Sequence, residues 1–274
     1  AGNHSYVQEF WLKQALGNVE ITAGLQDLNV EFANSENGAL FLNSSFGILP
    51  IISNNISAPI FPLTTLGLTC TLNITETIAW KNAVYDGSPA DFNYNPYNLN
   101  WKFNKGDGIL AITEFQKTLN IARLQGIYKI GIYSHFHSTS RVLEDSIPDL
   151  HLKSNTGVYM YADQKIWKQN DRSAGLFLQV GYSPSPQSFN SFYLGTGINF
   201  TGLLNRYGND VAGFALAYGK FRTGCEAALE FTYQYQVTKN LFIQPDVQYI
   251  INPIGTGEAL NNALGANLRF GFSF

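Results

Sequence analysis

Residues 228–253 read ALEFTYQYQVTKNLFIQPDVQYIINP, and this stretch decides the fold. In its first half every second residue is apolar or aromatic, and the residues between them are Glu, Thr and Gln. The apolar set is Leu229, Phe231, Tyr233, Tyr235 and Val237. The pattern turns at residues 239–240 and then starts again. Because a period of two is that of a β-strand with one apolar face, the stretch predicts a hairpin. Its apolar face contacts either a protein core or another apolar medium.

The composition limits the kinds of protein that this chain can be. Charged residues make up 14% of its 274 residues, against roughly 25% in a usual soluble domain. Aromatic residues also make up 14%, and the net charge is −3. This charge gives no case for a nucleic-acid partner. Because no run of about 18 apolar residues occurs, no transmembrane helix is expected. The two cysteines, Cys70 and Cys225, form no metal motif, and whether they pair stays open.

The same alternating unit, a strand of about ten residues followed by a turn, recurs along the chain. About thirteen strands are expected, centred on residues 7–16, 19–28, 63–74, 77–85, 108–119, 126–136, 157–167, 174–182, 191–200, 210–221, 227–237, 241–251 and 263–274. Turn-like connections alternate with longer segments, which are residues 29–62, 86–107, 138–155 and 253–262. Short turns on one rim and long loops on the other are typical of a transmembrane antiparallel up-and-down β-barrel.

A soluble β-sandwich also alternates apolar and polar residues, and is the simpler alternative. Three features favour a barrel in lipid. The polar faces carry Gly, Asn, Gln, Ser and Thr with few charges, aromatic residues gather at strand ends, and the strands are long enough to cross a bilayer at a tilt. Pro245 lies in the middle of a predicted strand and cannot donate to its ladder, so a local bulge is expected there.

Several stretches carry a family resemblance in consistent order along the chain. They are GLQDLNVEFANSENGALFLNSSFGILP (24–50), FPLTTLGL (61–68), AVYDGSP (83–89), AGLFLQVGYSPSP (174–186), the stretch 190–221, and the C-terminal block 228–274. The sequence resembles the OprB-type carbohydrate-selective porins. The resemblance implies a monomeric sixteen-stranded barrel in the outer membrane of Gram-negative bacteria, through which glucose and related sugars diffuse.

Residues 1–274 are therefore expected to form a single β-barrel domain. Because only about thirteen strands are visible and a bacterial barrel has an even number, we expect N-terminal strands to be missing from this chain. The competing expectation is a naturally smaller barrel.

Selectivity for sugars needs a lumen with weak, multiple contacts rather than a catalytic group. Amides, carboxylates and Arg pair with sugar hydroxyls. The polar faces of the C-terminal strands supply the expected pore-lining residues, which are Glu230, Gln234, Gln244, Asp246, Gln248, Asn267 and Arg269. The alternative for each of them is a solvated lumen residue without a role in selectivity.

Residues 29–62 are long for a loop and not very polar, with FLNSSFG (41–47) followed by ILPII (48–52). We expect this segment to fold into the barrel and narrow it. The candidate constriction residues are Glu36, Asn43, Ser44, Ser45 and Phe46. For Phe41 and Ile48 the favoured role is packing against the barrel wall.

The sequence predicts a sugar-permeable outer-membrane porin rather than an enzyme, with no cofactor. Its expected partners are outer-membrane lipid, lipopolysaccharide and small sugars. A metal site from His135, His137 and His151 is disfavoured, because no carboxylate or Cys stands at ligand spacing. A general diffusion channel and an adhesin-like barrel stay open as alternatives. No Ser/His/acid arrangement supports a hydrolase.

Overall fold

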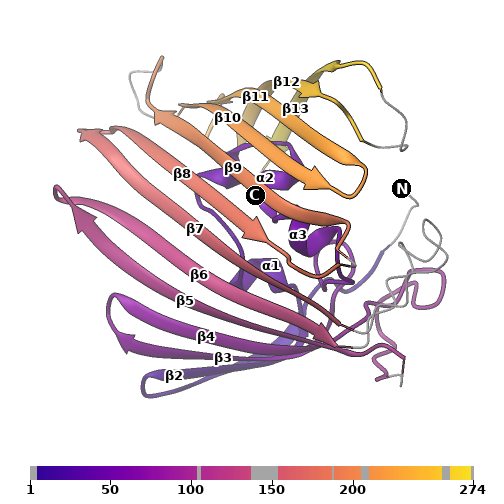
Figure 1. Cartoon of the computed structure of the whole chain (residues 1–274). Coiled ribbons are helices and arrows are strands. Elements are labelled where there is room, and N and C mark those ends of the chain that lie inside the picture. Colours follow the sequence, from indigo (N-terminus) through magenta and orange to yellow (C-terminus); the bar gives the residue numbers. More distant parts are fainter. Residues whose placement is uncertain are drawn as a thin grey trace.

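The structure is a computed structural model, and it describes residues 5–103, 106–136, 154–186, 188–204, 210–254 and 260–272. Its strands form one antiparallel sheet of thirteen strands, in which each strand pairs with its neighbours in the sequence. The strands are β1 (Phe10–Leu16), β2 (Val19–Gln26), β3 (Thr65–Thr75), β4 (Ile78–Asp86), β5 (Ile109–Ile121), β6 (Leu124–Phe136), β7 (Ser154–Gln169), β8 (Arg172–Tyr182), β9 (Asn190–Thr201), β10 (Asp210–Phe221), β11 (Gly224–Gln236), β12 (Leu241–Ile251) and β13 (Ala263–Phe272). The sheet curls around a concave interior (Figure 1). The predicted all-β, up-and-down architecture is confirmed.

Each predicted strand corresponds to one observed strand, and β10 and β12 have the predicted bounds. The largest extension is in β7, which runs from Ser154 to Gln169 where residues 157–167 were expected. One connection departs from the predicted alternation. Strands β10 and β11 are joined by residues 222–223 alone, on the rim that otherwise carries the longer loops.

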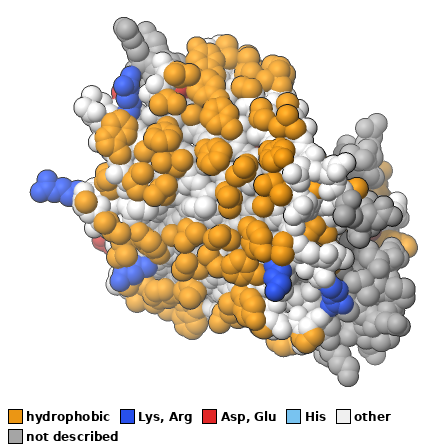
Figure 2. Space-filling view, turned by 45° about the horizontal axis from the view of Figure 1, so that its top comes forward, with side chains coloured by type: hydrophobic (Ala, Val, Ile, Leu, Met, Phe, Trp, Pro, Cys, Tyr) orange, Lys and Arg blue, Asp and Glu red, His pale blue; other side chains and the backbone are white. Residues whose placement is uncertain are grey.

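The apolar face of the opening hairpin lies on the outside of the sheet. Phe231 is 53% exposed, whereas its neighbours Glu230 and Thr232 point into the concave side and are fully buried. The alternation continues in β12, where Asp246 is buried and Val247 is exposed. Figure 2 shows apolar side chains spread over a broad surface, with charged side chains mostly near its margins. The apolar faces therefore cover no protein core, as expected for a wall that contacts lipid.

The core lies on the other side, between the wall and the connection from β2 to β3. This connection, which we call the inner segment (residues 27–64), holds α1 (Leu28–Glu31), η1 (Gly38–Leu40), α2 (Ser44–Gly47) and α3 (Pro50–Ser53). These short helices lie inside the curve of the sheet (Figure 1). Apolar side chains of the inner segment pack against buried wall residues, which include Tyr85, Tyr133, Tyr159, Tyr161, Phe177 and Tyr193. No helix in the described ranges is long and apolar enough to cross a membrane.

Pro245 does not produce the expected bulge, so this prediction was wrong. Thr232 faces Asp246 and Tyr235 faces Ile243, so the register of β11 against β12 is the same on both sides of Pro245. The pairs between them are missing, which is the cost of a residue without an N–H. The Thr232 hydroxyl donates to the Pro245 carbonyl at 3.4 Å. The two strands therefore lose residue pairs at this point but keep their register.

The cysteines do not pair. Cys70 lies on β3 and Cys225 at the start of β11, and both thiols are free.

Candidate functional site

Carboxylates on the inner wall hold the backbone of the inner segment. Asp163 on β7 accepts hydrogen bonds from the Ser35 hydroxyl at 2.7 Å and from the Asn37 N–H at 3.0 Å. Glu114 on β5 accepts from the Ala33 N–H at 2.9 Å. Charge-assisted hydrogen bonds of this kind are stronger than neutral ones. The two acids fix residues 33–37 against the middle of the wall.

A second pair of wall residues holds the next part of the segment. The Glu230 carboxylate on β11 accepts from the N–H groups of Leu42 and Asn43, at 2.5 Å and 3.0 Å. On β12 the Gln244 amide donates to the Leu40 carbonyl at 2.8 Å. The alternation of β11 and β12 points both side chains inward, so the contacts follow directly from the strand pattern.

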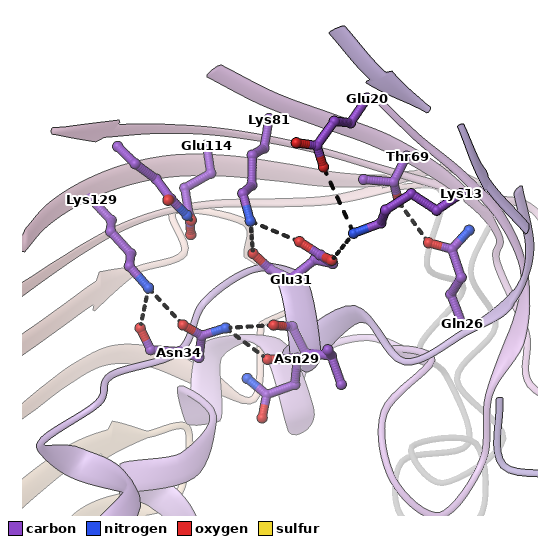
Figure 3. Close-up of polar contacts among 12 residues, drawn as sticks. Lys13, Glu20, Gln26, Asn29, Glu31, Asn34, Thr69, Lys81, Glu114 and Lys129 are labelled. Atoms are coloured by element: carbon purple, nitrogen blue, oxygen red, sulfur yellow. Dashed lines mark hydrogen bonds and ion pairs between the residues drawn. The ribbon is translucent and has the colours of Figure 1, made fainter. Parts of the chain in front are cut away.

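An ion cluster links α1 to the other end of the sheet (Figure 3). The Glu31 carboxylate lies 2.7 Å from Lys81 Nζ on β4 and 3.4 Å from Lys13 Nζ on β1. Lys13 also lies 3.9 Å from a carboxylate oxygen of Glu20 on β2. Burial raises the pKa of Glu31, but the hydrogen bond and charge of Lys81, with the charge of Lys13, outweigh burial and hold this pKa below its usual value.

Lys129 on β6 is a further anchor, labelled in Figure 3. It is buried, and its Nζ donates to the Asn34 carbonyl at 2.9 Å and to Asn34 Oδ1 at 2.6 Å. With the contacts above, side chains from β1, β4, β5, β6, β7, β11 and β12 all touch the inner segment. The segment thus crosses the concave side from one end of the sheet to the other.

The structure brings several predicted pore-lining residues together. One polar network contains Asn43, Glu230, Asp246, Gln248 and Asn267. In it Gln248 donates to Asp246 at 2.9 Å, Asn43 donates to Gln248 at 3.3 Å, and Asn267 donates to Asp246 at 3.4 Å. These residues come from the inner segment and from three consecutive strands, so the network joins the segment to the wall near β13.

The remaining predicted wall residues lie on the same concave face but apart from this network. Arg269 is paired with Gln244 in the register of β12 and β13. Its guanidinium carbon lies 5.6 Å from the centre of the Phe242 ring. Gln234 lines a cavity at the rim with the short turns.

The five residues predicted on the segment have different environments. Glu36 and Ser44 are exposed, whereas Asn43 and Ser45 are half-buried. The Ser45 hydroxyl donates a hydrogen bond to Asn43 Oδ1 at 2.7 Å. Phe46 has no exposed surface, and its ring centre lies 5.7 Å from that of Phe177. Phe46 therefore belongs to the packing of the segment and not to its exposed edge.

Several residues that hold the segment were missed in the sequence. They are Lys13, Lys81, Glu114, Lys129 and Asp163 on the wall and Glu31 on the segment itself. Glu20, which pairs with Lys13 on the wall, was missed as well. The wall members lie at inward positions of their strands, so the alternation followed in the C-terminal strands would have found them in the N-terminal ones.

The histidines give no metal site in the part of the chain that the structure describes. His135 is buried, and a ring nitrogen contacts the Gly87 carbonyl. His137 and His151 lie outside the described residues. Among the described residues no group of three or more His, Cys, Asp or Glu could hold a metal ion.

Two cavities flank the inner segment. One, of about 430 Å³, lies between the segment and β9 to β11 towards the rim with the long loops. The other, of about 480 Å³, lies towards the rim with the short turns and is lined by Glu36, Asn37, Lys165, Asn199 and Gln234, among others. The segment separates two spaces on the concave side.

A curved up-and-down sheet with an apolar outer face, a polar inner face and a segment folded inside it defines the class of β-barrel channel proteins. A family model described as "Carbohydrate-selective porin, OprB family" matches residues 1–274. The chain belongs to this family.

Solved structures agree with this assignment at the level of the fold. The high-pH structure of Pseudomonas putida OprB has a TM-score of 0.84 and 20% identity, over 98% of this chain and 73% of that one. The low-pH structure of the same protein has a TM-score of 0.63 and 20% identity, over 96% of this chain and 66% of that one. Comparison with curated proteins gave no match.

The protein is thus a carbohydrate-selective porin, through which sugars pass by passive diffusion. The predicted function is confirmed at this level. The family is one of transport channels rather than enzymes.

Proposed function

We propose that residues 29–62 form the constriction of this pore, and that the polar residues around them set which solutes pass. The observation that carries the proposal is the set of contacts from β1 to β12, which hold the segment across the concave side. A segment held at so many points narrows the passage by a fixed amount, because few of its residues can move independently.

The charges of the proposed constriction are arranged to suit uncharged solutes. Glu31 is balanced by two lysines, and Lys129 is held by two oxygens of Asn34. Charged rings in a pore select ions, whereas here the carboxylates of Glu114, Asp163 and Glu230 are engaged by backbone N–H groups of the segment. Amides such as Gln248 and Asn267 can instead exchange hydrogen bonds with sugar hydroxyls. This arrangement supports passage of neutral polyols through several weak contacts.

Removal of the constriction tests the proposal. Replacing residues 29–62 by a short Gly/Ser linker should raise the single-channel ionic conductance in planar bilayers several-fold. Unchanged conductance would rule the constriction out.

Because the replaced segment carries much of the core, a milder variant is also needed. Asp163→Ala removes the acceptor for the hydrogen bonds of Ser35 and Asn37. This should lower the free energy of unfolding by about 1–3 kcal/mol. The conductance should become larger and noisier. Asp171→Ala, at the exposed turn between β7 and β8, is the matched control and should behave as the unaltered protein.

We further propose that the barrel lies in the outer membrane as a monomer, with its apolar outer face against lipid. By the usual arrangement of such barrels the long loops face outward, towards lipopolysaccharide, and the short turns face the periplasm. Exposed apolar residues on the outer face, such as Phe214, Phe231 and Val247, support this setting.

A further inference from the structure

We propose that the cavity at the long-loop rim is a binding site for one sugar ring, occupied before the sugar crosses the constriction. We call it the rim cavity. It is lined by Ser44, Ser53, Asn54 and Phe61 of the inner segment and by Gly219 and Glu226 of the wall, among others. Its volume of about 430 Å³ falls in the range of roughly 300–1,000 Å³ found for small-molecule sites. The inference rests on the proposed constriction, because the segment that narrows the pore also builds the cavity.

The polar groups of the rim cavity are available to a ligand. Ser44 and Asn54 are exposed, and Ser53 is half-buried. Within the described ranges no hydrogen bond engages the side chains of these three residues. A serine hydroxyl both donates and accepts, and an asparagine amide offers two donors and one acceptor. The three together can therefore match the mixed donors and acceptors of adjacent sugar hydroxyls.

An aromatic ring stands beside these polar groups. Phe61 is 71% exposed although it lines a cavity. Exposed aromatic surface in water is unfavourable, at about 25 cal/mol for each Å² left uncovered. The C–H face of a sugar ring would cover this surface while its hydroxyls reach the serines and the amide. The wall opposite combines two small residues, Ala217 and Ala228, with the aromatic rings of Tyr193 and Phe221, so a sugar ring there meets further aromatic surface.

The cavity on the other side of the segment differs in chemistry. Its lining includes Glu36, Asp163, Lys165 and Asn199, and no aromatic residue is among its described lining. A sugar there meets hydrogen-bonding groups and charges but no ring to pack against. Ring binding is therefore confined to the long-loop side, and a sugar that enters from that side meets the ring-binding cavity before it reaches the constriction.

The test measures how glucose reduces the ion current through single channels in planar bilayers. Phe61→Ala should raise the glucose concentration for half-reduction of the current about five-fold. Phe61→Tyr keeps the ring and should restore the original value. Ser173→Ala, at the short-turn cavity, is the control and should have no effect. Glucose added on the long-loop side should reduce the current at lower concentration than glucose added on the other side.

An unchanged half-reduction concentration in Phe61→Ala, or equal effects from both sides, would overturn the proposed site. The absence of any glucose effect in the unaltered protein would overturn it too. The constriction is judged separately, by conductance without sugar. If replacing residues 29–62 leaves that conductance unchanged while Phe61→Ala still weakens the glucose effect, the constriction fails and the rim cavity stands.

Discussion

Glu31 is the residue on which the response of the inner segment to acid depends. It is the carboxylate that links α1 to both Lys81 and Lys13. These lysines hold its pKa below the usual value although burial opposes them. The ionised form is therefore the one that the folded protein prefers.

The sign of the pH dependence follows from this shift. A carboxyl whose pKa is lower in the folded state stabilises the fold above its unfolded pKa, about 4.3, and the contribution is lost as pH falls through the lowered value. We expect the contribution of Glu31, measured as the difference in conductance between the unaltered protein and Glu31→Gln, to be constant from about pH 7 to pH 5 and to vanish below about pH 4. At neutral pH, Glu31→Gln should already have the conductance that the unaltered protein reaches only below about pH 4.

The control for this prediction is Glu20→Gln. Glu20 contacts only Lys13 of the cluster, at 3.9 Å, and its side chain is more exposed. A surface ion pair of this kind contributes little, so the variant should keep the original pH profile. Identical profiles for Glu31→Gln and the unaltered protein would show that the response has another source.

At this scale the sequence predicted only part of the site. Glu230 was identified because it lies at an inward position of the clearest hairpin. Asp163 and Glu114 were not identified, although they also accept hydrogen bonds from backbone N–H groups of the inner segment. Their partners are 126 and 81 residues away along the chain, so no local pattern marks them as anchors. An inward acid is visible in a sequence, whereas the backbone N–H that it accepts from is not.

Among the elements, β10 is built to receive the inner segment. Its inward positions hold only small residues near the segment, including Gly213, Ala215 and Ala217. A Cβ added at Gly213 would lie 2.7 Å from side-chain atoms of both Leu40 and Phe41. The segment can approach this strand closely only because no side chain stands there.

Gly213→Val should therefore push the segment away from the wall. Inserting methyl groups into such a packed contact costs about 1–3 kcal/mol. On gels that separate the folded barrel from the heat-unfolded chain, the folded band of the variant should disappear at a lower temperature than that of the unaltered protein. Gly265→Val is the matched control, because a Cβ at Gly265 on β13 meets no atom within 4 Å. If both variants melt together, the close approach of the segment to β10 does not stabilise the protein.

The strands were predictable because a period of two persists over ten or more residues in each. The helices of the inner segment were not, because α1, α2 and α3 have four residues each, which is barely one turn and too short for a helical period. The bulge at Pro245 was expected from the missing N–H alone. That reasoning left out the pairing of Pro245 with Leu268 on β13, which continues without interruption.

At the scale of the whole molecule, the apolar outer surface determines whether the barrel can insert into a membrane. Phe231→Arg places a charge on the apolar outer face, at a position that is 53% exposed. On the lipid face of such barrels an Arg near the bilayer midplane costs about 2–4 kcal/mol. We expect less protein in the outer-membrane fraction and a weaker heat-modifiable band.

The matched substitution Gln234→Arg, on the same strand but facing inward, should assemble normally and change only conduction. Equal assembly of the two variants would contradict a lipid-facing role for the outer surface.

We expect the wall and the inner segment to be completed at different times during folding. Every sheet pair joins strands that are neighbours in the sequence, so the wall can grow hairpin by hairpin from local contacts. Leu42 and its acceptor Glu230, by contrast, are 188 residues apart. We infer that the segment stays unanchored on one side until β11 is in place, and protease cleavage between residues 34 and 43 should disappear late in refolding. The barrel is therefore expected to form first as a wide channel and to become selective among solutes only at the end of folding.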